Sequence, residues 1–124
     1  MIQEFLAKAQ ENLQDAERAL EEGRYNASAN RAYYAAFQAA IAALAQESIT
    51  HTKNPHAWVQ AQFSERLIKA RKYYPAKLSS HLLDMQRIRD NADYKPTMTS
   101  KKTAKEQLQL SKEFLSLIFS RLQP

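Results

Sequence analysis

The stretch NASANRAYYAAFQAAIAALAQ, residues 26–46, decides the fold of this chain. It is rich in alanine, the best helix former, and contains no glycine or proline, so it predicts one long helix that begins near Asn26. Two apolar seams follow the helical repeat, one of larger side chains and one of alanines: Tyr34, Phe37, Ile41 and Leu44, and Ala29, Ala32, Ala36, Ala39 and Ala43.

A helix that is apolar on two sides either lies at the centre of a bundle or contacts a second subunit. A monomer of this size should struggle to bury both seams of residues 26–46, and we therefore expect a symmetric homodimer.

The composition of the whole chain favours a bundle of such helices. Gly23 is the only glycine among 124 residues, whereas the turns of β-hairpins depend on glycine. We expect an all-α, up-and-down bundle of four or five helices that forms a single domain over residues 1–124. The formal charge of +5 favours a polyanionic partner.

The sequence also disfavours several kinds of site and location. There is no cysteine, so disulfides and thiolate metal sites are excluded. Residues 1–20 lack the features of a signal peptide, and no apolar run is long enough to span a membrane. We expect a cytoplasmic protein with no membrane partner, no cofactor and no metal site, because His51 and His56 have no carboxylate nearby in the sequence.

Four further helices are expected from apolar periodicity and capping residues, over residues 2–22, 54–70, 75–93 and 99–122. Gly23 takes the left-handed position that ends the first of them. Asn54 caps the next, with Pro55 at its first position, and Thr99 or Ser100 caps the last.

The segment with the most chemistry is LSSHLLDMQRIRDNADYKP, residues 78–96. On a helical wheel, Arg89 falls in the middle of the apolar face, and Arg87 falls almost opposite. A buried arginine is costly unless it is paired, and Asp90 or Asp93 is the expected partner. One interpretation is a structural ion pair that locks this helix to a neighbour. The other is a polar cleft that presents the planar guanidinium to phosphate.

Two motifs resemble the signature of the HEPN domain family (higher eukaryotes and prokaryotes nucleotide-binding). RAYYA, residues 31–35, with the alanines after it resembles the first block, and RIRDNADY, residues 87–94, resembles the second, an arginine shortly before Asp-Tyr. The turn at Gly23, Arg24 and Tyr25 also matches. The resemblance covers nearly the whole chain and implies a four- or five-helix bundle that dimerises.

The resemblance implies RNA or nucleotide chemistry. Many members are ribonucleases, often toxins paired with a minimal nucleotidyltransferase antitoxin, and this chain resembles the Asp-Tyr variety. The family's catalytic motif is an arginine, four to six residues, then a histidine, with a tyrosine two positions on. Counting from Arg87 places Ala92 at the histidine position, and counting from Arg89 places Tyr94 there. Neither can supply the usual proton transfer, since a tyrosine pKa of about 10 makes a poor base.

We therefore expect a HEPN-type module, part of a toxin–antitoxin or nucleotidyltransferase-linked system, that binds a phosphate-containing ligand or RNA in a dimer cleft. The expected site has Arg89, Asp90 and Tyr94 at the catalytic positions and, for nucleotide or RNA binding, Asn30, Arg31, Arg87, Asp93 and Lys95. The alternatives are an active metal-independent ribonuclease and a purely structural dimerisation module. Tyr33 and Tyr34 are expected in the core rather than as stacking platforms for bases.

Overall fold

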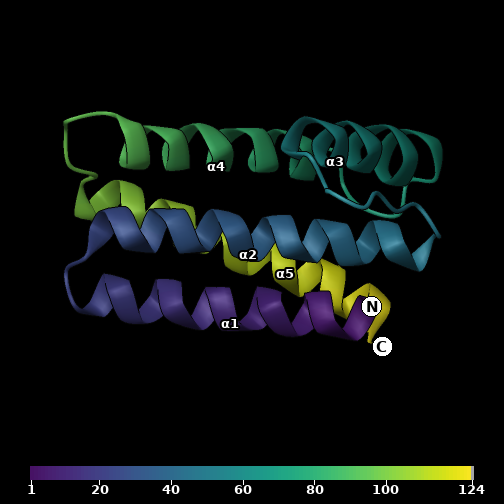
Figure 1. Ribbon diagram of the computed structural model, residues 1–124, viewed down its shortest axis with the longest axis horizontal. Helices are drawn as coiled ribbons and strands as arrows, with labels where there is room; N and C mark the ends of the chain where they lie inside the picture. The colour runs from purple at the N-terminus through teal and green to yellow at the C-terminus, as the bar shows by residue number, and fades with distance from the viewer. Residues whose placement is uncertain (124) are drawn as a thin grey trace.

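The computed structural model describes residues 1–123, and within them the chain is a bundle of helices with no strand. Its segments in order are α1 (Ile2–Glu21), α2 (Tyr25–Gln46), α3 (His56–Gln62), the π-helical η1 (Phe63–Ala70), α4 (Lys77–Tyr94) and α5 (Lys101–Leu122). Figure 1 shows α1, α2 and α4 side by side along the long axis, with α5 behind them. The all-α bundle is confirmed.

α2 lies at the centre and contacts every other helical segment. Its residues from Ala39 to Leu44 are all buried, on every side of the helix. The small alanine side chains let the neighbouring helices approach closely, and Phe37 of the larger seam stacks on His56 of α3. One chain thus buries most of both seams, and the argument for a dimer from these seams was wrong.

Three buried, uncharged side chains fasten α2 to its neighbours through main-chain carbonyl oxygens. Ser28 donates to a carbonyl of α1 at 2.8 Å, and Ser111 of α5 donates to a carbonyl of α2 at 2.8 Å. The Gln107 amide of α5 donates to the carbonyls of Ala29 in α2, at 3.2 Å, and Met85 in α4, at 2.9 Å. These bonds fix how α1, α4 and α5 sit around the central helix.

Two of the expected helix ends are confirmed. Gly23 has a φ of +74°, the left-handed conformation that closes the turn between α1 and α2. The Ser100 hydroxyl accepts the Thr103 N–H at 3.1 Å and so caps α5.

Two expected caps were wrong. Asn26 lies inside α2, and its side-chain oxygen accepts the Thr99 N–H at 2.9 Å, so it anchors the loop before α5 instead. Asn54 has a φ of +46° and precedes Pro55, the true N-cap residue of α3. In each case a residue suited to capping serves a loop conformation instead.

α3 and η1 form one continuous helical arm over residues 56–70. It packs against α2 and α4 at one end of the bundle. The loops that enter and leave this arm contain Ser48, Asn54 and Lys72, which have positive φ values of 62°, 46° and 56°. None of the three is glycine, so these loops hold strained backbone. No helix among residues 1–123 has the length and apolar character needed to span a membrane.

Candidate functional site

Arg89 lies on the inner face of α4, as the helical wheel predicts, and its side chain is only 12% exposed. Its Nε donates to Asp93 at 3.0 Å, its Nη1 to Asp90 at 3.1 Å, and its Nη2 to the Tyr94 hydroxyl at 3.3 Å. Both carboxylates named from the sequence are therefore partners. A guanidinium has further N–H groups beyond these three, so Arg89 keeps donors for a ligand.

Aromatic rings surround the Arg89 guanidinium on its other sides. Its central carbon lies 5.9 Å from the ring centroid of Tyr33, 5.3 Å from that of Tyr34 and 5.7 Å from that of Tyr94. Burial opposes the charge, but the hydrogen bond to Asp93 and the charge of Asp90 outweigh it and raise the pKa of Arg89. Arg89 is therefore a permanent cation held in one orientation.

Asn30 and Arg31 extend this arrangement along α2. The Asn30 amide donates to both oxygens of Asp93, at 3.2 and 2.9 Å, and its carbonyl oxygen accepts the Arg31 Nε–H at 2.8 Å. Arg31 also donates to Asn12 at 3.2 Å and lies 5.0 Å from the centroid of Tyr34. Within residues 1–123 no carboxylate oxygen lies within 4 Å of Arg31. Its positive charge is oriented by neutral partners and remains uncompensated.

His56, at the start of α3, belongs to the same cluster, although no pattern in the sequence connects it with Arg89. Its ring stacks on Phe37, with centroids 4.3 Å apart and an interplanar angle of 18°. Its Nδ1 lies 2.7 Å from the Tyr33 hydroxyl, which in turn accepts the Gln60 amide at 3.3 Å.

These contacts decide the tautomer of His56. Tyr33 is fully buried, and the Nδ1 of His56 is the one acceptor in reach of its hydroxyl proton among the described residues. A buried hydroxyl that failed to donate would be costly, so Tyr33 donates to Nδ1 and the proton of the imidazole sits on Nε2. His56 is thus an N–H donor at its free edge.

Burial, followed by the positive charge of Arg89, lowers the pKa of His56 below its ordinary value of 6.5. Burial also raises the pKa of Tyr33 to about 12. Both side chains are therefore neutral at pH 7, and the charges between α2 and α4 are those of two arginines and two aspartates. We call this group the α2–α4 cluster: Asn30, Arg31, Tyr33, Tyr34, His56, Arg89, Asp90, Asp93 and Tyr94.

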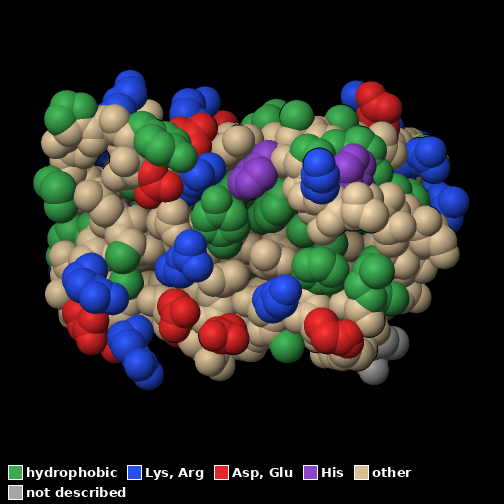
Figure 2. Space-filling model, in the orientation of Figure 1, with side chains coloured by type: hydrophobic (Ala, Val, Ile, Leu, Met, Phe, Trp, Pro, Cys, Tyr) green, Lys and Arg blue, Asp and Glu red, His purple; other side chains and the backbone are tan. Residues whose placement is uncertain are grey.

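Figure 2 shows basic, acidic and histidine side chains next to one another on the face where α4 meets α2. Tyr33 is buried, as expected, and Tyr34 is half-buried beneath the two arginines. Tyr94 is the exposed aromatic side chain at this edge, with 74% of its surface accessible. It is the ring best placed to stack with a base.

Two residues expected in the site lie outside the cluster. Arg87 points away from the bundle, with a side chain 71% exposed and paired with Asp84 one turn earlier at 3.2 Å. Lys95 is exposed directly after the last turn of α4, and no side-chain hydrogen bond connects it to the cluster. His51 lies against Trp58, with ring centroids 5.1 Å apart. Within residues 1–123 no three histidine or acidic side chains converge to hold a metal ion.

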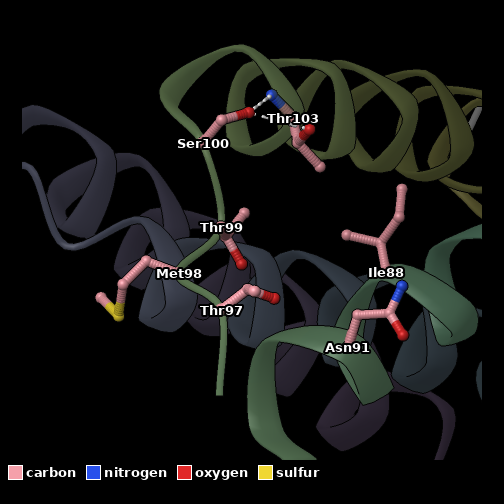
Figure 3. A pocket seen from close by; sticks show the side chains of 7 residues that line it. All are labelled: Ile88, Asn91, Thr97, Met98, Thr99, Ser100 and Thr103. Carbon is pink, nitrogen blue, oxygen red and sulfur yellow. Dashed lines mark hydrogen bonds between the residues drawn. The ribbon is translucent and has the colours of Figure 1, made fainter. Parts of the chain in front are cut away.

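A separate hollow of about 240 Å³ lies between the last turns of α4 and the loop before α5 (Figure 3). Its lining is uncharged and consists of Ile88, Asn91, Thr97, Met98, Thr99, Ser100 and Thr103. With no cation in its wall, this hollow lacks the charge that would attract a phosphate. The α2–α4 cluster is therefore the better candidate site.

Two comparisons with known proteins bear on this arrangement. The model of a family described as HEPN domain matches residues 2–122, which include all five α-helices and every residue of the cluster. No curated protein matches the sequence.

Proposed function

The chain belongs to the HEPN domain family, and from that premise we propose that it binds RNA through phosphate groups at the α2–α4 cluster. As a HEPN domain it is a helical module associated with nucleotides or RNA. The observation that carries the proposal is a pair of arginines, Arg31 and Arg89, on the ring of Tyr34 at 5.0 and 5.3 Å. Both keep unused N–H donors, at an edge of the bundle where Tyr94 is exposed.

Each member of the cluster has a distinct part in this proposal. Arg31, which has no carboxylate partner among residues 1–123, supplies the charge that attracts the ligand, because the charge of Arg89 is balanced by Asp90 and Asp93. Arg89 adds directed donors whose orientation the two aspartates fix. Tyr94 offers a ring to an unpaired base.

A ribonuclease remains the second candidate function, and His56 is the observation that favours it. It is the one histidine in the α2–α4 cluster. It comes from α3 and supplies the residue type that this chain lacks at the histidine position of the catalytic motif. Because the pKa of His56 is lowered, little of it is protonated and able to act as an acid at pH 7. Its Nε2 carries a proton and its Nδ1 accepts from Tyr33, so neither ring nitrogen is free to act as a base. We therefore expect binding with little or no cleavage.

The oligomeric state and the partner protein are also proposals. We propose that the chain acts as a homodimer with a nucleotidyltransferase partner, in a toxin–antitoxin or related system. With the seams of α2 buried inside one chain, the support for the dimer is the family resemblance alone. Light scattering at micromolar concentration distinguishes a dimer from a monomer, whose mass is 14.3 kDa.

The central experiment is a titration of short single-stranded RNA against wild type, Arg89→Lys and Tyr94→Ala. Lysine keeps the charge of Arg89 but loses its planar fork, and alanine removes the stacking ring, so each should weaken binding roughly tenfold. Arg87→Lys, on the same helix but outside the cluster, is the matched control. Equal affinity for all four proteins would reject the cluster as the site, and no binding by wild type would reject the proposal.

The same proteins incubated with labelled RNA test the ribonuclease alternative. Cleavage by wild type that is lost in His56→Gln, with binding retained, would establish His56 as its proton-transfer residue. Intact RNA between pH 5 and 8 would support a binding function.

A further inference from the structure

A second hollow, of about 380 Å³, lies beside the turn between α1 and α2. We call it the arginine pocket, and its wall consists of Asp15, Arg18, Ala19, Arg24, Ala27, Asn30 and Arg31. Alanines at 19 and 27 leave the space between the two helices open. Figure 2 shows basic side chains near this end of α1 and α2, on the same face as the α2–α4 cluster.

The charge of the pocket is strongly one-sided. Three arginines face a single carboxylate, that of Asp15, and within residues 1–123 no Lys or Arg nitrogen lies within 4 Å of it. Arg24 is paired with Glu22 at 3.4 Å, a contact between two exposed side chains that contributes little. Arg18 and Arg31 have no carboxylate partner in the described chain. With three arginines and one carboxylate, the wall of the pocket carries a net positive charge.

The fold fixes the backbone of Arg24 and the side chain of Arg31. The Arg24 N–H donates to the Ala19 carbonyl at 2.8 Å across the tight turn, which fixes the start of α2 against the end of α1. The side chain of Arg31 is oriented by two asparagines, Asn12 and Asn30, which are neutral and leave its charge available. An anion entering the pocket therefore meets one cation that is already oriented, Arg31, with Arg18 and Arg24 beside it.

Asn30 connects the arginine pocket to the α2–α4 cluster. Its carbonyl oxygen accepts from Arg31, in the wall of the pocket, and its amide donates to Asp93, inside the cluster. The two sites thus share two side chains, those of Asn30 and Arg31.

We propose that the arginine pocket binds a phosphate group of the same RNA strand, one nucleotide or more away from the group held at Arg89. This inference rests on the proposed function and extends it to Asp15 and Arg18, which the motifs do not include. The shared chemistry is a phosphate anion, and the two possible sources are an RNA strand and a free nucleotide.

The test uses three substitutions at exposed or half-buried positions of the full chain: Arg18→Gln, Arg31→Gln and Asp15→Asn. Each protein is titrated with a short single-stranded RNA, a 5′-mononucleotide and inorganic pyrophosphate at two or more salt concentrations. Arg87→Gln, an exposed arginine outside both sites, is the matched control.

We expect Arg18→Gln and Arg31→Gln each to weaken RNA binding several-fold and to reduce the log–log salt slope by about one. Asp15→Asn should strengthen binding, because it removes the one negative charge in the wall. Tighter binding of the strand than of the mononucleotide supports an RNA backbone as the ligand. Tighter binding of the mononucleotide than of the strand would contradict an RNA strand as the ligand and would assign the pocket to a free nucleotide.

Failure of this inference is distinct from failure of the proposed function. If Arg18→Gln and Asp15→Asn bind RNA like Arg87→Gln while Arg31→Gln and Tyr94→Ala are weakened, the arginine pocket is rejected and the cluster stands. If wild type binds pyrophosphate, with loss in Arg18→Gln, but no RNA, the pocket is an anion site and the RNA proposal is rejected. If wild type binds none of the three ligands, both are rejected.

Discussion

α2 meets its neighbours in two contrasting ways. Toward α1 and α5, three polar side chains are neutral and fully buried, and Ser28, Gln107 and Ser111 all donate to main-chain carbonyls. Toward α4, the contacts are charged and partly exposed, with Asp90 and Asp93 side chains that are 45% and 25% accessible. Side chains at a wet edge can exchange partners with a ligand, whereas those in the dry interior cannot. The dry, buried contacts therefore hold the fold, and the charged, exposed side chains are free to serve function.

The largest effect on stability is expected in the dry interface. Gln107→Ala removes two buried hydrogen bonds and leaves a cavity, and should lower the free energy of unfolding by about 2–4 kcal/mol. Urea denaturation followed by circular dichroism measures the loss. The RNA affinity of the folded fraction should stay unchanged. If Gln107→Ala instead keeps its stability and loses RNA affinity, the proposed difference between the two interfaces is wrong.

A smaller loss of stability is expected at the charged interface. Arg89→Ala leaves two carboxylates without their partner, but both are accessible to water, so we expect about 1–2 kcal/mol. Arg87→Ala, which breaks one exposed pair, should stay within about 0.5 kcal/mol of wild type. If Arg89→Ala unfolds the protein altogether, the ion pairs are a structural lock, and the purely structural module gains support.

The smallest effect should appear as a dependence of stability on pH. Burial lowers the pKa of His56 in the folded protein, so the unfolded chain takes up its proton first as the pH falls through about 6.5. The folded state should therefore lose stability below that pH, and this loss should be absent in His56→Gln. His51→Gln controls for the removal of a histidine. An identical pH profile for wild type and His56→Gln would show that His56 is not buried against Phe37.

Local patterns were enough to predict most of the fold. The alanine-rich run predicts α2, Gly23 predicts its turn, and the apolar wheel of α4 places Arg89 on the inner face beside its two aspartates. These features depend on residues within one or two helical turns of each other. For the same reason the sequence left open whether α2 is central or contacts a second chain, because that depends on how the other helices pack.

The parts that could not be predicted depend on contacts between distant residues. His56 meets Tyr33 from 23 positions away, and the seven-residue α3 is too short for its periodicity to show which side faces inward. Gln107 was missed because glutamine usually lies at the surface, and only its two carbonyl partners explain its complete burial. A polar residue in the middle of the apolar stripe of α5 was the available signal.

The strained loops around the α3–η1 arm have a consequence for the order in which the protein opens. Ser48 and Lys72 hold left-handed backbone conformations that cost about 1 kcal/mol each and that relax when the arm detaches. Amide protons of residues 56–70 should therefore exchange with deuterated water before those of α2, which is enclosed on all sides. Each such opening would withdraw His56 from Tyr33 and briefly admit solvent to the aromatic side of Arg89, so the strain in two loops sets how often this side of the cluster is uncovered.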